Sequence, residues 1–416
     1  MRLGLGPEDY SPALVRKIAR HGAKDSFEEA SVDLREDVGI EIAPRQVERI
    51  TERIGSEWAQ ARDRDVAAFR ERHLARLHPQ APEVAAVMPD GGRLQTRASG
   101  AEPGVHNPQW REPKYGCCVT LHSKQSRTDP RPDPPEAFVN PERVAKLVAG
   151  VSSRGAVPAA RAPKNKRAPE RRKRRRRQRR PRKRHSWRAP RCLVRTAVAT
   201  MQSSDRFGEL LAMEAHRRSL DLARRKAYVS DGQAYNWTIW EEHFRPLGFV
   251  AVLDFVHLLT YVYQAAQAAG GSAKERWRRY ERWLRWTWGG ERAKLLSALT
   301  KASEDAGGPP EGAAESDPRR VIASARTYVI NNLDKMDYPR YRKLGLPTSS
   351  APVESEIKQF NRRVKGTEKF WTEEGAETVL QVRSAYLSQD GRADRNWAMP
   401  RPHYRAVGRN RLALVG

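Results

Sequence analysis

The pattern of apolar and polar positions indicates which stretches of the chain are helical. In residues 1–80 the apolar positions recur at helical spacing, as Val47, Ile50 and Ile54 illustrate. Two patterns of helix length flank a glycine-containing turn in this segment. They predict either a DNA-binding helix-turn-helix or a plain helical bundle.

Short apolar runs predict β-strands further along the chain. The first run, 84–89, stops at Asp90, and the strand-like stretch 114–124 follows it. The strand pattern returns at 191–201. Beyond residue 204, helix and strand patterns alternate, and they cover 205–223, 226–232, 235–244 and 248–257. This alternation predicts an α/β fold, a sheet with helices packed against it.

Residues 258–345 are predicted to be helical and are rich in tryptophan. These rings are more typical of an aromatic core inside a helical insertion than of a surface that stacks on bases. A late helix then begins within 347–371. Its apolar positions fall at i, i+4, i+7 and i+11, namely Val353, Ile357, Phe360 and Val364. The neighbouring stripe consists of Glu354, Lys358, Asn361 and Lys365.

The charge of the chain predicts a polyanionic partner. The chain has a formal net charge of +28. Residues 161–190 hold 17 Lys or Arg and a single acid, Glu170, and so supply +16 of that total. Such a tract repels itself and is predicted to be disordered. It suits binding to a nucleic-acid backbone without sequence preference, although a tolerated surface insertion would look the same.

Other compositional features narrow the function classes. The three cysteines, Cys117, Cys118 and Cys192, have no zinc-type spacing and suit a reducing compartment. The longest apolar run, 249–263, is interrupted by Asp254 and His257 and is too short to span a bilayer. No membrane role is expected.

Three acids occupy positions where an α/β sheet can bring them together. Asp90 and Asp231 each end a strand-like run, and Glu354 opens the late helix. Carboxylates held close together repel one another unless a cation offsets their charge. Mg²⁺ or Mn²⁺, bound as two ions, prefers such oxygen ligands and promotes phosphoryl transfer. Asp-Gly is also a common turn signal, so a plain turn role for Asp90 and Asp231 stays open.

The block at 346–392, with its Val353-Glu354-Ser355 and the run from Arg363 to Trp371, resembles the C-terminal signature of bacterial insertion-sequence transposases of the Kra type. Shorter matching stretches lie in the same order at 90–97, 134–148, 193–201, 254–257 and 331–347. Together the matches are collinear over most of residues 84–395. The long block is specific, whereas each short stretch alone is not.

The resemblance implies a DDE transposase with a ribonuclease-H-like catalytic core. The helical patterns of residues 1–80 add an all-helical N-terminal domain before that core. The catalytic, metal-binding acids of the core fall on Asp90, Asp231 and Glu354. The basic and amide groups that would contact DNA near Glu354 are Lys358, Asn361, Arg362, Arg363, Lys365 and Lys369.

Two of the three catalytic acids have an alternative residue nearby in the sequence. The stretch Asp254 to His257 looks like the C/DxxH motif of Mutator-like transposases, so Asp254 competes with Asp231 as the second acid. Otherwise Asp254 and His257 would support the site. Glu356 competes with Glu354 in the same way. Pro89, directly before the first acid, departs from the pattern that the resemblance implies, because proline is unfavourable inside a central strand.

The implied partners are DNA, as element ends and as target, and a second copy of the chain on that DNA. The implied location is the bacterial cytoplasm, at the nucleoid. The alternatives are a decayed, non-catalytic nucleic-acid-binding protein and a ribonuclease-H-like nuclease that cuts but never joins strands. The predicted segments are the helical domain 1–80, core 84–126, disordered insertion 127–190, core 191–257, helical insertion 258–345, catalytic helices 346–395 and tail 396–416.

Overall fold

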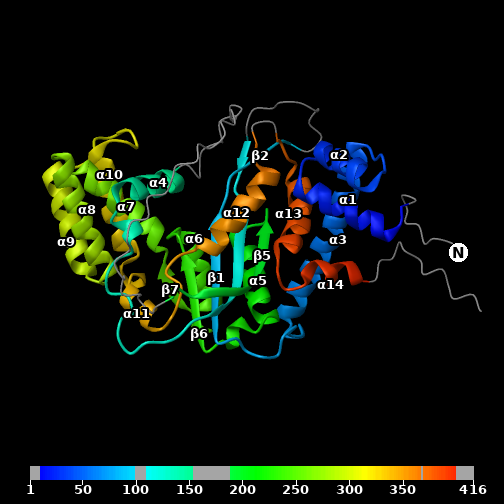
Figure 1. Cartoon of the computed structure of the whole chain (residues 1–416), viewed down its shortest axis with the longest axis horizontal. Helices are drawn as coiled ribbons and strands as arrows, with labels where there is room; N and C mark the ends of the chain where they lie inside the picture. The colour runs from blue at the N-terminus through cyan, green and yellow to red at the C-terminus, as the bar shows by residue number, and fades with distance from the viewer. Residues whose placement is uncertain (1–9, 99–108, 153–187, 367–368, 400–416) are drawn as a thin grey trace, which may run out of the picture. The chain divides into compact units, whose positions relative to one another are not determined.

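A computed structural model describes most of the chain, namely residues 10–98, 109–152, 188–366 and 369–399. It divides into two compact units that interleave along the sequence (Figure 1). The first comprises 1–122, 192–251 and 350–416, and the second comprises 123–191 and 252–349. Most of the Arg-rich tract falls in 153–187, outside the described residues.

A mixed sheet of five strands in the order β5-β4-β1-β6-β7 lies mainly in the first unit, and the last two residues of β7 are assigned to the second. This confirms the predicted α/β class. β1 pairs antiparallel with β4 and parallel with β6. The strands are β1 (Val84–Gly91), β4 (Lys114–His122), β5 (Arg191–Thr200), β6 (Arg225–Ser230) and β7 (Val250–Leu253).

β1 lies at the centre of the sheet because its apolar run can be buried on both faces. Val84 to Met88 are all fully buried, as expected of a strand with neighbours on both sides and helices on both faces. Pro89 is accommodated within β1, opposite Gly116 of β4. The ladder with β6 ends at Val87, before the proline, so the missing N–H removes no bond on that side.

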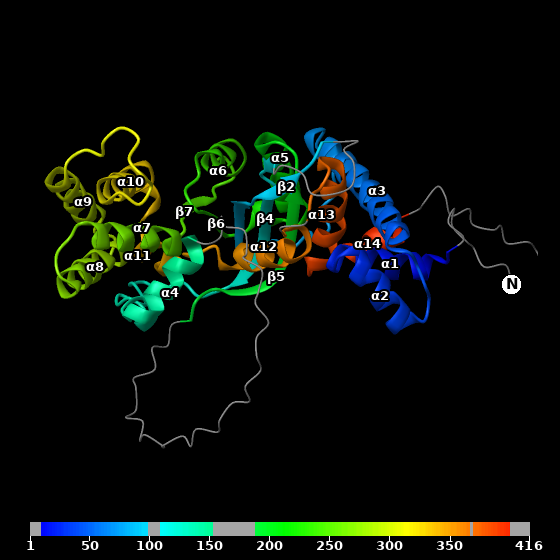
Figure 2. The same cartoon turned by 90° about the horizontal axis from the view of Figure 1, so that it is seen from above.

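Helices cover both faces of the sheet (Figure 2). On one face, Tyr115 of β4 stacks on Phe360 of α12, with ring centroids 5.0 Å apart. On the other face, α5 approaches closely at Gly116. A Cβ there would lie 2.5 Å from Leu211 of α5, so only glycine allows this approach. The helices of this unit are α1 (Pro12–Lys24), α2 (Phe27–Val38), α3 (Pro44–Arg70), α5 (Ser204–Arg217), α6 (Ala234–Ile239), α12 (Ala351–Val364), α13 (Glu373–Leu387) and α14 (Arg392–Ala398).

The predicted helices of the N-terminal segment are confirmed. A capping box of Ser26 and Glu29 starts α2, and Gly39, at φ 71°, ends it. The core of these helices extends into the C-terminal part of the chain. Their buried apolar residues join Val382 and Ala385 of α13 in a single cluster. The N-terminal helices therefore pack against the C-terminal part of the chain.

The second unit is helical, as predicted for 258–345. Trp283 and Trp288 are almost fully buried, which confirms their role in an aromatic core. The predicted disorder of 127–190 is wrong for residues 141–152, because they form α4 and bury Val144. The α-helices of this unit are α4 (Pro141–Ser152), α7 (Phe255–Ala268), α8 (Ala273–Trp288), α9 (Arg292–Ala306), α10 (Pro318–Asn331) and α11 (Tyr338–Lys343).

Several short elements complete the fold. A small hairpin pairs β2 (Leu94–Thr96) with β3 (Gln109–Arg111). A π-helical turn, η4 (Trp240–Phe244), extends α6. The 3-10 turns are η1 (Glu136–Phe138), η3 (Leu220–Leu222) and η5 (Leu333–Lys335). Among the described residues, every helix is too short or too polar to cross a membrane.

Candidate functional site

Asp90 and Asp231 lie at the same edge of the sheet. In the parallel pairing of β1 with β6, Val84 stands opposite Arg225 and Val87 opposite Tyr228. The same register, carried on to the ends of the two strands, sets Asp90 level with Asp231. Asp90, near the end of β1, and Asp231, directly after β6, thus lie at the carboxyl ends of neighbouring parallel strands, the edge at which open α/β sheets bind ligands.

Asp231 also holds the turn that follows β6. Its Oδ1 accepts hydrogen bonds from the Gln233 N–H and from Asn236 Nδ2, both at 3.2 Å. Gly232 has φ 97°, a conformation that favours glycine. The turn role considered for Asp231 is therefore real, and it fixes the direction of the carboxylate at the end of the strand.

Sequence reasoning missed a group of side chains beside these two acids. Burial raises the pKa of Tyr235, and the negative charges of Glu112, Asp231 and Asp90 raise it further. A Cβ on Gly91 would lie 2.3 Å from Glu112 Oε1 and 3.1 Å from the Tyr235 hydroxyl. Glu112 and Tyr235 therefore lie directly beside the end of β1.

Lys114 is the positive member of this group. Its ammonium forms an ion pair with Glu112 and lies 4.7 Å from the centre of the Tyr235 ring. Lys114 is opposite Gly91 in the β1–β4 ladder, so the strand register brings it to the acids. The sequence contains no signal for this pairing, because it depends on which strands are neighbours.

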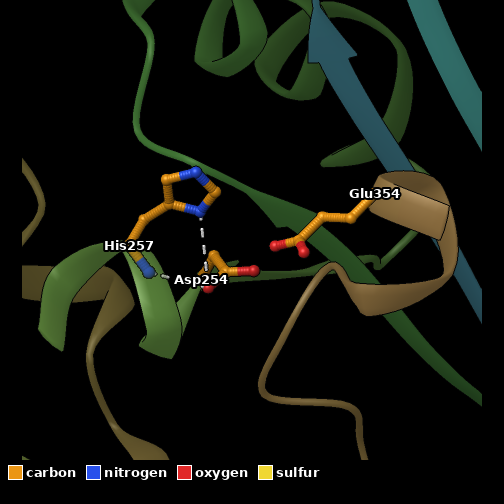
Figure 3. Close-up of side chains that lie close together, drawn as sticks. All are labelled: Asp254, His257 and Glu354. Carbon is orange, nitrogen blue, oxygen red and sulfur yellow. Dashed lines mark hydrogen bonds and ion pairs between the residues drawn. The ribbon is translucent and has the colours of Figure 1, made fainter. Parts of the chain in front are cut away.

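Asp254, His257 and Glu354 form a group that could hold a metal ion (Figure 3). Each side chain offers one ligand atom, and these atoms all lie within 4.8 Å of one another. Asp254 directly follows the sheet strand β7. Glu354 lies in the first turn of α12, the helix that packs on β1 and β4. Among the described residues, Asp90 and Asp231 are not part of this group.

Asp254 is fully buried and is the N-cap of α7. Its Oδ1 accepts hydrogen bonds from the N–H groups of Val256, at 2.6 Å, and His257, at 3.0 Å. The His257 ring lies beside the same carboxylate, with its Nδ1 3.5 Å from Asp254 Oδ1. This local geometry explains the spacing of the Asp254 to His257 motif, because residues i and i+3 meet in the first turn of a helix.

The donor atoms suit a divalent cation. Two carboxylates and one imidazole match Mn²⁺ and other first-row ions, and the carboxylates alone match Mg²⁺. Figure 3 shows the Glu354 carboxylate extending from α12 toward Asp254. A cation here would offset the two neighbouring negative charges.

Glu356, the rival of Glu354, lies elsewhere. It is 1% exposed, and its carboxylate lies near Arg195 Nε, at 3.5 Å. Burial raises the pKa of Glu356 to about 7, against the opposing effects of a hydrogen bond with Cys117 and the charge of Arg195. Among the described residues, Glu354 and not Glu356 belongs to the group that could hold a metal.

The buried position of Glu356 predicts a pH-dependent stability. Its pKa of about 7 in the folded state exceeds the ordinary value of 4.5, so its contribution is complete below pH 4.5 and is lost as pH rises through 7. We expect the free energy of unfolding to fall by about 2 kcal/mol between about pH 5.5 and 8 for this reason. Glu356→Gln should not show this fall in urea unfolding. Exposed Glu311→Gln serves as the control, and an unchanged pH slope in Glu356→Gln would contradict the assignment.

The predicted DNA contacts on α12 and just beyond it differ in accessibility. Lys358 and Arg362 are exposed, one helical turn apart. Asn361 and Lys365 are half-buried. Lys369 donates to the backbone carbonyls of α12's last turn, those of Arg362 and Arg363.

Arg363 requires a correction. It is 2% exposed, and its guanidinium lies between the rings of Phe27, at 4.5 Å, and Trp371, at 4.8 Å. Its Nε donates to the Gly22 carbonyl at 2.7 Å. Arg363 therefore joins α12 to the N-terminal helices and does not present a charge to DNA.

Comparisons with known proteins assign no family to the chain. No family model matches the chain, and no curated protein matches it.

Proposed function

We propose that the chain is a DDE transposase that cleaves and joins DNA strands with the help of divalent metal ions. The observation that carries the proposal is the parallel pairing of β1 with β6. It sets Asp90 level with Asp231 at the carboxyl ends of adjacent strands. Two acids in this position give a sheet edge the charge needed to bind metal ions against a phosphate.

The strand order supports a ribonuclease-H-like core. If the five strands of the main sheet are numbered in chain order, their order across the sheet is third, second, first, fourth and fifth. The expected core carries its first acid on the first strand and its second after the fourth strand. Asp90 lies on β1, and Asp231 directly follows β6. The helices α7 to α11 then separate β7 from α12, where Glu354 lies, as in a core with a helical insertion.

The proposed metal ligands are Asp90, Asp231 and Glu354. The group of Asp254, His257 and Glu354 supports the rival assignment, in which Asp254 is the second acid. Both assignments share Glu354. In the first of them Asp254 orients the start of α7, and His257 supports the site through Asp254.

Two Mg²⁺ or Mn²⁺ ions, when bound, would stabilise the attacking and leaving oxygens of an in-line displacement at phosphorus. The acids of the chain hold and space that charge. Lys358 and Arg362, exposed on the helix that carries Glu354, bind backbone phosphates and position the strand. This chemistry needs no covalent protein intermediate, so no Ser, Tyr or Cys nucleophile is assigned.

The proposed partners are the DNA ends of an insertion sequence and its target. Two ends must be processed together, so we propose a homo-oligomer on DNA, working at the bacterial nucleoid. The high net charge of +28 is consistent with a polyanionic partner.

The test uses the full chain and a plasmid that carries the DNA flanking its own gene. Cleavage at the flanks in Mg²⁺ or Mn²⁺, none in EDTA, and joining of the freed 3′ ends to a second plasmid are expected. Cutting without joining would make the chain a nuclease. Binding without cutting, in any divalent metal, would make it a non-catalytic DNA-binding protein.

A further inference from the structure

The helix α8 separates its basic residues into two sets. It carries Lys274, Arg276, Arg278, Arg279, Arg282 and Arg285, against two acids, Glu275 and Glu281. Arg276 donates to the Gly271 carbonyl, and Arg279 donates to the carbonyls of Ala266 and Gly270. These two arginines secure the end of α7 and are structural.

The other four bases form what we call the α8 stripe, namely Lys274, Arg278, Arg282 and Arg285. All four are exposed. Their spacing of i, i+4, i+8 and i+11 puts them on one side of the helix, one turn or about 6 Å apart. Throughout the part of the chain that the structure describes, no ion pair is found for any of them. Two other bases of the same unit do form ion pairs, Lys294 with Glu291 and Arg319 with Asp317.

The two acids of α8 offset only part of the charge of the four stripe residues. Glu275 is committed to the capping box, where it accepts from the Ser272 N–H at 2.7 Å. Glu281 is half-buried. The stripe thus keeps a net positive charge over about three turns of helix, or about 16 Å.

The opposite side of α8 is fixed in the core of the helical unit. Tyr280, Trp283, Leu284 and Trp288 are buried. The Tyr280 hydroxyl donates to the Phe138 carbonyl, and Trp288 Nε1 donates to the Arg131 carbonyl, both at 2.9 Å. The stripe is therefore displayed on a rigid helix, which lowers the entropy lost when it binds a partner.

We propose that the α8 stripe is a binding surface for the phosphate backbone of duplex DNA. Three of the four bases are arginines, whose guanidinium groups match phosphate oxygens in pairs. Basic residues one helical turn apart can contact successive phosphates without reading bases. The apolar side of α8 is already buried, so the helix has no apolar face with which to enter a lipid surface. The choice of DNA as the polyanion rests on the proposed function.

The test compares two quadruple variants of the full chain. One replaces Lys274, Arg278, Arg282 and Arg285 with Gln. The matched control keeps every charge, with Lys274→Arg, Arg278→Lys, Arg282→Lys and Arg285→Lys. Binding to a fluorescent duplex of random sequence is measured by anisotropy in EDTA, across a range of salt concentrations. Circular dichroism checks that each variant is folded.

We expect the Gln variant to bind about tenfold or more weakly at physiological salt, with a salt slope smaller by about 3 to 4. The charge-keeping variant should bind like the wild type. Equal affinity and slope in all three proteins would overturn the proposal. So would a Gln variant that loses binding to anionic vesicles but keeps its affinity for DNA.

Failure of this inference is distinguishable from failure of the proposed function. Binding in EDTA needs no cleavage. A chain that never cuts DNA but loses affinity in the Gln variant keeps the α8 stripe and loses the transposase assignment. A chain that cuts at its flanks, but whose Gln variant binds as the wild type does, loses only the α8 stripe.

Discussion

Replacing Glu354 with Gln is expected to lower metal-dependent strand cleavage by about 10³-fold. Both candidate sets of ligands contain Glu354, and Gln keeps the shape of the side chain and one acceptor oxygen while removing its charge. The affinity of the chain for DNA in EDTA should stay close to that of the wild type. Exposed Glu311→Gln, which removes the same charge elsewhere, should cut normally. Full cleavage by Glu354→Gln would contradict both assignments of the site.

The second acid is identified by the same assay with Asp231→Asn and Asp254→Asn. Asparagine is the informative replacement, because its side-chain oxygen can still accept the N–H bonds that Asp231 and Asp254 receive now. Alanine at Asp254 would also remove the N-cap of α7, at a cost of about 1 kcal/mol. Loss of cleavage in Asp231→Asn alone supports the set Asp90, Asp231 and Glu354. Loss in Asp254→Asn alone moves the second ligand to Asp254 and leaves the reaction unchanged.

A measurement of metal binding separates the two sets without any reaction. Luminescence of Tb³⁺, an oxygen-seeking ion, should be weaker in Glu354→Gln than in the wild type. If the luminescence of Asp231→Asn or of Asp254→Asn is also weaker, that aspartate binds the same cation as Glu354. If Tb³⁺ luminescence is the same in all variants, these acids do not hold the ion.

Local patterns in the sequence predicted much of the fold. The buried run from Val84 predicted β1, and the spacing of Val353, Phe360 and Val364 predicted the face that α12 buries. The end of β7 was predicted less well, because apolar residues continue on both sides of Asp254, from Leu253 into the first turn of α7. The boundary between β7 and α7 is the fully buried Asp254, which can be recognised only by its role as the N-cap of α7.

Contacts between distant segments could not be predicted. The pairing of β1 with β6 brings the strand ends that carry Asp90 and Asp231 to the same edge of the sheet, and no spacing in the sequence encodes that pairing. Arg363 is a second case. It borders the apolar stripe of α12, and whether such a residue meets solvent depends on what covers it. Here Phe27 and Trp371 do, so a residue expected to bind phosphate is part of the core.

Arg342 gives the largest expected effect on stability. It is 1% exposed, and its guanidinium lies 4.1 Å from the centre of the Trp288 ring. Its Nη2 donates to the Trp288 carbonyl at 2.9 Å, and its Nε donates to Asp129 Oδ1 at 2.9 Å. Burial alone would raise the pKa of Asp129, but hydrogen bonds from Arg342 and the Arg131 N–H lower it.

Arg342→Met should lower the free energy of unfolding by about 3 to 5 kcal/mol, because it leaves the Asp129 carboxylate largely buried without its partner charge. Urea unfolding followed by tryptophan fluorescence measures this, since Trp288 lies against the altered side chain. Lys294→Met, which breaks the exposed pair with Glu291 in the same unit, should cost less than about 1 kcal/mol.

The pH dependence shows whether the unpaired charge is the cause. Asp129 has a lowered pKa in the wild type, so the pair stabilises the fold above the ordinary range of a carboxyl and loses that contribution as pH falls. In Arg342→Met the carboxyl can take up a proton at higher pH, and the penalty should shrink between about pH 7 and 4. Adding Asp129→Asn to Arg342→Met should recover part of the loss at neutral pH. A penalty that is independent of pH and of Asp129 would instead indicate lost packing against Trp288.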